Sequence, residues 1–133
     1  MPIVKASTFA DPNDVAAYRK AIAEGKSRSE ALRLGDDGIG SWGDDTTSED
    51  IPMCALPPED WETKWGGGEN ARGKKVRVTY KGKSVTGDLR DTMPHKKNIT
   101  NGAGIDLNPG FVKSFGLKPG FLLDGFAWEW ADS

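Results

Sequence analysis

Two aspartates lie close together in the sequence, each beside an element able to hold it in place. Asp91 follows an extended segment that returns from a hairpin, and Asp106 lies in Ile105-Asp106-Leu107, directly before a helix start. Glycoside cleavage needs a protonated carboxylic acid, and a second carboxylate raises the pKa of the first or activates water. The pair predicts such chemistry, with carboxyl groups about 6.5–9.5 Å apart for inversion or about 5 Å apart for retention. The alternative is that both aspartates only bind backbone amides.

Further polar and aromatic side chains are candidates for a substrate groove beside this pair. They are Trp42, which would stack on a sugar ring, and Asp44, Asp45, Thr46, His95, Lys97 and Asn101. Simpler roles are packing for the tryptophan and exposed loop positions for the histidine and lysine.

The cysteine and histidine counts limit other chemistry. Cys54 is the single cysteine and His95 the single histidine, so an intrachain disulfide and multi-histidine or cysteine metal clusters are excluded. We expect no metal and no cofactor. A Cys54–His95–Asp thiol-hydrolase triad is disfavoured, because Pro52-Met53-Cys54-Ala55-Leu56 is an apolar setting typical of an inert thiol.

Alternating and capping patterns place the elements that position these residues. Residues 74–80 alternate as a strand, Lys81-Gly82 makes a tight turn, and residues 83–90 return. Further short strands are expected at residues 39–42 and 121–130. Capping patterns predict helices at residues 12–24, between Ser27 and Gly35, at 59–64 and at 109–115.

Composition favours one β-rich domain. The chain has 133 residues with 17 glycines and 8 prolines, which suits short elements joined by specific turns. The formal net charge of −2 gives no attraction for nucleic acid. No apolar run has the length of a signal peptide core or a membrane span, so we expect either a cytosolic product or a leader that was removed.

Several motifs, in this order, resemble the barrel domain of the rare lipoprotein A type. They are Gly40-Ser41-Trp42-Gly43, Val76-Arg77-Val78, Gly82-Lys83-Ser84-Val85, Asp91 with Pro94, Gly104-Ile105-Asp106-Leu107 and Phe115-Gly116-Leu117. The resemblance covers residues 38–130. The same barrel occurs in expansins, lytic transglycosylases and inverting endoglucanases. It implies a double-psi β-barrel in which Asp106 is the acid of a polysaccharide groove and Asp91 supports it. The Ser-Trp-Tyr-Gly start of the family is only partly kept, because Gly43 follows Trp42 directly.

These observations predict a mainly β fold: a six-stranded double-psi β-barrel with short helices, and two N-terminal helices packed on it. The predicted division is a helical extension at residues 1–36 and a barrel domain at 37–133. The first functional hypothesis is a secreted or cell-envelope lytic transglycosylase or glycosidase acting on peptidoglycan, with Asp106 and Asp91 as catalytic residues. The alternative is a non-catalytic barrel that binds glycan as expansins do, or binds a protein as related protease inhibitors do. We expect a monomer in either case.

Overall fold

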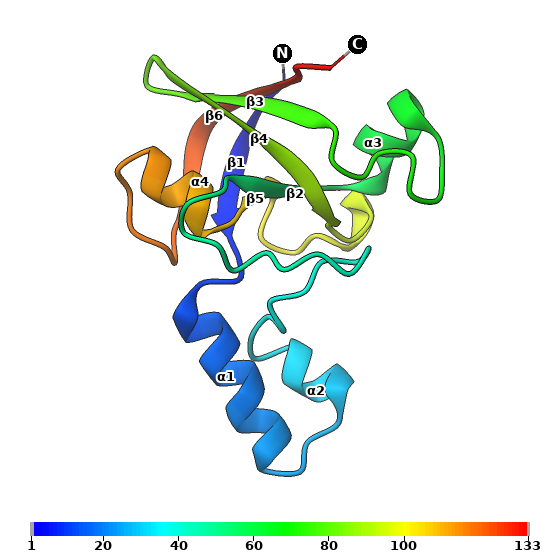
Figure 1. Cartoon of the computed structure of the whole chain (residues 1–133), viewed down its shortest axis with the longest axis vertical. Coiled ribbons are helices and arrows are strands. Elements are labelled where there is room, and N and C mark those ends of the chain that lie inside the picture. The colour runs from blue at the N-terminus through cyan, green and yellow to red at the C-terminus, as the bar shows by residue number, and fades with distance from the viewer. Residues whose placement is uncertain (1, 133) are drawn as a thin grey trace.

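The computed structural model describes residues 2–132, and its centre is a closed barrel of six strands (Figure 1). The strands follow one another around the barrel in the order β1-β5-β2-β4-β3-β6. Their bounds are β1 Ile3–Thr8, β2 Met53–Leu56, β3 Lys75–Tyr80, β4 Lys83–Thr92, β5 Ala103–Leu107 and β6 Leu122–Trp130. The helices are α1 Pro12–Ala23, α2 Arg28–Leu32, α3 Pro58–Trp65 and α4 Pro109–Ser114, with a 3₁₀ turn η1 at Lys96–Asn98. The predicted mainly β, six-stranded barrel is therefore confirmed.

The strand pairing relates the two halves of the chain by an approximate twofold symmetry. β1 is parallel to β5 and antiparallel to β6, while β4 is parallel to β2 and antiparallel to β3. The two remaining pairs, β2 with β5 and β3 with β6, are antiparallel. Exchanging β1 with β4, β2 with β5 and β3 with β6 leaves this pattern unchanged. The barrel is thus two interlocked units of three strands.

The first strand, β1, was not predicted, and it changes the division of the chain. Val4 and Ala6 pack against the barrel core, and β1 fills the gap between β5 and β6. A boundary between residues 36 and 37 is therefore wrong, because it separates this strand from the barrel that it closes. The helical residues are instead an insertion between β1 and β2.

Helices α1 and α2 form the inserted hairpin, and their starts agree with the capping patterns in the sequence. The Asp11 side chain accepts hydrogen bonds from the backbone N–H groups of Asn13 and Asp14, and Ser27 accepts one from Glu30. The two helices pack against each other and extend from one end of the barrel, in blue and cyan (Figure 1). No helix in the described part of the chain combines the length and apolar character that a membrane crossing requires.

The inward faces of the strands and one side of α4 form the core. Alternate residues of β3 and β5 point inward, as period-two strands require, and α4 contributes Phe111 and Val112. The largest fully buried apolar side chains include Phe111, Phe126, Leu56, Leu89, Ile105, Leu107, Val76 and Val78. Trp61 and Trp128 are also buried, while Trp65 and Trp130 are only partly buried.

Residues 36–52 cross the end of the barrel without the predicted strand at 39–42. That stretch contains only one isolated bridge, between Ile39 and Asp45. The buried Asn108 side chain holds the segment: its Nδ2 group donates to the carbonyl oxygens of Thr46, Ser48 and Ile51. Its Oδ1 atom accepts from two backbone N–H groups, which belong to Met53 and Phe111. This segment forms the link between the helical hairpin and the barrel.

Candidate functional site

Four residues form one row across four neighbouring strands, at the end of the barrel that residues 36–52 cross. Asp106 on β5 is in register with Ser7 on β1 and with Ala55 on β2, and Ala55 is also in register with Asp91 on β4. Residues in register point to the same face of a sheet, so the two predicted aspartates share a face. With strands about 4.8 Å apart, their Cα atoms are about 10 Å from each other. Ala55, which has a small side chain, is the only residue between Asp106 and Asp91 in this row.

Asp106 is the more perturbed of the two carboxyl groups. Its Oδ1 atom accepts a hydrogen bond from the Ser7 hydroxyl group. Burial, together with the smaller effect of the negative charges of Asp91, Asp36 and Asp14, raises the pKa of Asp106 to about 7. Asp106 therefore holds its proton at mildly acidic pH and is divided between its two protonation states near neutrality.

Asp91 has a different environment. Burial raises its pKa, but hydrogen bonds to the ionised carboxylate oppose that rise. Its Oδ1 atom accepts from the Ser41 N–H group at 2.9 Å, the Ser41 hydroxyl at 2.9 Å and the Thr92 N–H group at 2.8 Å. Asp91 thus anchors the loop around Ser41 to the end of β4, which is the backbone-binding role that the sequence left open.

Two further aspartates of this cluster were not identified from the sequence. Burial raises the pKa of Asp36 to about 6, and the carboxylates of Asp91, Asp37 and Asp14 contribute. Burial also raises the pKa of Asp14 on α1. The signal at Asp36 was the Asp36-Asp37-Gly38 turn, in which Asp36 accepts a hydrogen bond from the Gly38 N–H group at 2.6 Å. No group of three or more His, Cys, Asp or Glu side chains within residues 2–132 has the arrangement of a metal site.

The accessible side of Asp106 faces a small hollow of about 180 Å³. Met93, Pro94 and residues 98–101 line it together with Asp106. Asn101 also lines a neighbouring hollow of about 460 Å³, to which Asp14 and Asp36 belong. The lining of the Asp106 hollow is aliphatic and polar, without an aromatic ring.

The remaining predicted groove residues are divided between the site and other environments. Asn101 lies at the site, where its side chain also accepts a hydrogen bond from the Ala103 N–H group. Thr46 is fully buried, so its side chain cannot contact a substrate, and that prediction was wrong. The Asn108 side chain also donates a hydrogen bond to the Thr46 carbonyl oxygen.

Trp42 and Asp44 are engaged in contacts within the protein. Trp42 packs edge-on against Trp61, with ring centroids 5.4 Å apart, and its indole N–H donates to the Gly68 carbonyl group. Asp44 accepts two hydrogen bonds from the Arg72 guanidinium group, at 2.9 and 3.0 Å. Both contacts stabilise the loops around the barrel end.

Asp45, His95 and Lys97 lie at the surface. Asp45 accepts hydrogen bonds from the hydroxyl and N–H groups of Thr47, which lower its pKa. The Nδ1 atom of His95 is 3.0 Å from a carboxylate oxygen of Glu59. Lys97 is exposed in η1. The structure therefore does not gather these three residues around Asp106.

Cys54 has the inert character that its apolar setting predicts. Its side chain is fully buried, and burial raises the pKa of the thiol. A nucleophilic cysteine needs an accessible thiolate, which this position does not provide.

The fold and site define a small closed β-barrel with a partly buried acidic cluster at one end. One solved structure with this fold is that of the Streptomyces papain inhibitor, which matches with a TM-score of 0.54 at 20% sequence identity. The match covers 96% of this chain and 91% of that chain. No protein-family model and no curated protein matches the sequence. At this identity the likeness shows a shared fold.

Proposed function

We propose that this protein is a protein-binding barrel with a protease as its partner. The observation that carries the proposal is the fold shared with the Streptomyces papain inhibitor over nearly the whole of both chains. Papain is therefore the protease with which the proposal is tested.

The geometry around Asp106 favours binding over glycan cleavage. The hollow beside Asp106 is about 180 Å³, below the roughly 300–1,000 Å³ of typical small-molecule sites. Asp91, which the sequence predicts to be the catalytic partner of Asp106, accepts two hydrogen bonds from Ser41 and one from Thr92 and so fixes the Ser41 loop. Trp42, the intended sugar platform, packs against Trp61. Each of these residues has a structural role that needs no substrate.

Residual protease activity tests the first proposal. Papain would be titrated with the full chain, and cleavage of a small chromogenic peptide substrate would be followed. We expect activity to fall in proportion to added protein until the two are equimolar. A serine protease titrated in parallel would show whether the effect is selective. Full papain activity in the presence of an excess of the barrel protein would contradict the proposal.

A second candidate function is the glycan-cleaving activity inferred from the sequence. The observation that favours it is the pKa of Asp106 at about 7, since a general acid must hold a proton at the working pH. In this hypothesis Asp106 donates its proton to the leaving oxygen, and Asp91 keeps the pKa of Asp106 high through its charge.

We also propose the double-psi type for the barrel, which the parallel β1–β5 and β2–β4 pairs and the twofold pattern support.

Release of soluble muropeptides from peptidoglycan tests this second candidate. The variant Asp106→Asn keeps an oxygen that can accept the Ser7 hydrogen bond but cannot donate an acidic proton. Asp124→Asn, at an exposed position of β6, is the matched control. Release by the wild type and by the control, but not by Asp106→Asn, would support cleavage. Glycan pull-down without release would instead support an expansin-like binding module.

A further inference from the structure

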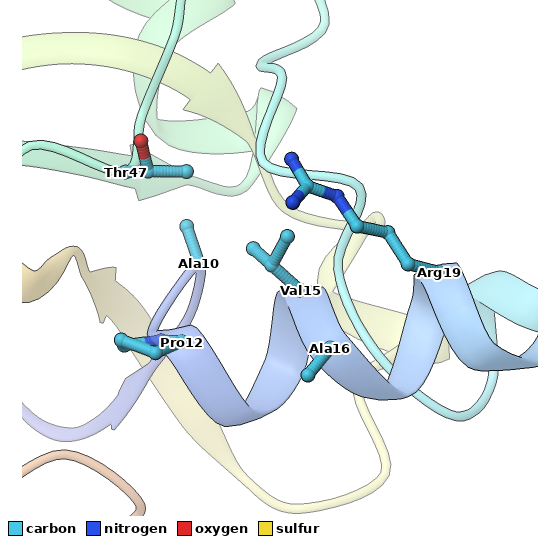
Figure 2. A pocket seen from close by; sticks show the side chains of 6 residues that line it. All are labelled: Ala10, Pro12, Val15, Ala16, Arg19 and Thr47. Atoms are coloured by element: carbon cyan, nitrogen blue, oxygen red, sulfur yellow. The ribbon is translucent and has the colours of Figure 1, made fainter.

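A groove separate from the Asp106 cluster runs between α1 and residues 45–49. Its central hollow has a volume of about 540 Å³ and is lined by Ala10, Pro12, Val15, Ala16, Arg19 and Thr47 (Figure 2). It shares Arg19 and Thr47 with a hollow of about 340 Å³, and Pro12 with another of about 150 Å³. The three hollows therefore adjoin one another along a single face.

Residues 45–49 form a fixed wall of this groove. The carbonyl groups of Thr46 and Ser48 point inward to the side chain of Asn108. The side chains of Asp45, Thr47 and Glu49 line the three hollows in turn. The hydrogen bonds to the buried asparagine hold the backbone of this wall in place.

The groove is apolar at its centre and has one free cation. Figure 2 shows the side chains of Ala10 and Val15 pointing toward Thr47 from below, with the Arg19 guanidinium group at one end. The Thr47 hydroxyl donates a hydrogen bond to the Asp45 carboxylate, so the methyl group of Thr47 is the part of this side chain that is left for the groove. Within residues 2–132, the guanidinium group of Arg19 takes part in no ion pair or hydrogen bond.

The two acidic residues that line a hollow together with Arg19 already have partners within the protein. Asp37 and Asp45 share the 340 Å³ hollow with it. Asp37 pairs with Arg28 at 3.0 Å, and Asp45 accepts from the N–H and hydroxyl groups of Thr47. A carboxylate from outside the chain would therefore meet a guanidinium group with its donors available.

We propose that this groove binds an extended segment of a protein partner, in which an apolar residue is followed two positions later by an acidic residue. Val15 and Arg19 are four residues apart on α1, which corresponds to about 6 Å along the helix axis. In an extended chain, side chains on one face repeat every two residues, or about 6.6 Å. One side chain would thus occupy the hollow beside Val15 while the next on the same face reaches Arg19. The inference rests on the proposed function in that the occupant is a protein.

A fluorescent peptide with a Leu-Thr-Glu centre, flanked by glycines and blocked at both ends, is the probe for this groove. Fluorescence polarisation with the full chain would compare it with Leu-Thr-Gln and Leu-Glu-Thr peptides. We expect Leu-Thr-Glu to bind about tenfold or more tightly than either, because only it places a carboxylate at Arg19. Equal affinities for the three peptides, or no saturable binding of the first, would overturn the proposal.

Two protein variants locate the binding on the molecule. Arg19→Gln should weaken Leu-Thr-Glu binding by about tenfold or more and remove the preference over Leu-Thr-Gln. Lys20→Gln removes the same charge from the next, exposed position of α1 and should change neither. Equal losses in both variants would show a general charge effect and would overturn the site.

The papain titration separates this inference from the proposed function. If papain is inhibited equally by the wild type and by Arg19→Gln, and the peptides show no preference, the groove is wrong while protease binding stands. If the peptides behave as expected but papain keeps full activity, the groove stands and the choice of a protease is wrong.

Discussion

Replacing Asp106 by asparagine should stabilise the protein at neutral and higher pH. The folded pKa of about 7 lies above the ordinary value of 3.8, so folding holds the proton of Asp106 more tightly than the unfolded chain does. At pH values between these two pKa values the native state binds more protons than the unfolded state does. The free energy of unfolding therefore falls as the pH rises through this range. Asparagine carries no charge at any of these pH values, so the variant escapes this loss.

The size of the effect follows from the difference between the two pKa values. The folded pKa of about 7 exceeds the ordinary value of 3.8 by about 3.2, and each pKa unit corresponds to 1.36 kcal/mol. The product is about 4 kcal/mol, which is an upper bound because the site is in partial contact with solvent. We expect Asp106→Asn to be about 2–4 kcal/mol more stable than the wild type at pH 8, and nearly equal to it at about pH 4. The Ser7 hydroxyl keeps an acceptor in the variant, so the comparison isolates the charge.

Urea unfolding followed by tryptophan fluorescence, repeated across this pH range, measures the difference. The wild-type free energy of unfolding should fall by at most about 1.4 kcal/mol per pH unit for each group that titrates. Asp36, with a pKa of about 6, titrates in both proteins, and its electrostatic coupling to Asp106 is part of the measured difference. The exposed control Asp124→Asn should follow the wild type. Parallel curves for the wild type and Asp106→Asn would refute the reasoning.

Three other outcomes follow from single contacts. Asn108→Ala should lower the free energy of unfolding by about 3 kcal/mol or more in the same assay, because it leaves several buried backbone groups without partners. Gly40→Ala should destabilise by about 1–3 kcal/mol, since a Cβ atom there would lie 2.1 Å from the Arg90 carbonyl oxygen; an unchanged melting temperature would contradict this. Cys54 should resist a thiol reagent in native buffer and react in urea, and rapid labelling of the folded protein would contradict its burial.

The elements with strong local signals could be predicted from the sequence. The hairpin of β3 and β4 follows from alternation on both sides of Lys81-Gly82, and both turn residues have positive φ. Helix α4 begins where Asn108 and Pro109 predict, because a side-chain cap and a fixed φ act within a few residues.

The elements that depend on distant partners could not be predicted in the same way. β1 pairs with β5 in an irregular register, in which one extra β5 residue, Gly104, lies between the partners of Lys5 and Ala6. β2 is four residues long and buried throughout, so it shows no alternation. The path of residues 36–52 is set by Asn108, which is far along the chain.

The acidic cluster was only partly visible in the sequence for the same reason. Asp106 and Asp91 could be recognised, because each follows or ends a local element. Asp36 and the Ser7 hydroxyl reach them only through the pairing of β1 with β5 and the return of the helical hairpin. The roles of Trp42 and Asp44 likewise depend on Trp61 and Arg72, which no local pattern connects to them.

Complex formation with papain tests the central functional proposal most directly. Equimolar amounts of the full chain and of papain with a blocked active-site cysteine would be mixed and separated by size-exclusion chromatography with light scattering. Protease binding predicts a single species whose mass is the sum of one copy of each protein. Two peaks at the separate masses, at concentrations where the barrel is folded, would contradict the proposal that this barrel binds a papain-like protease.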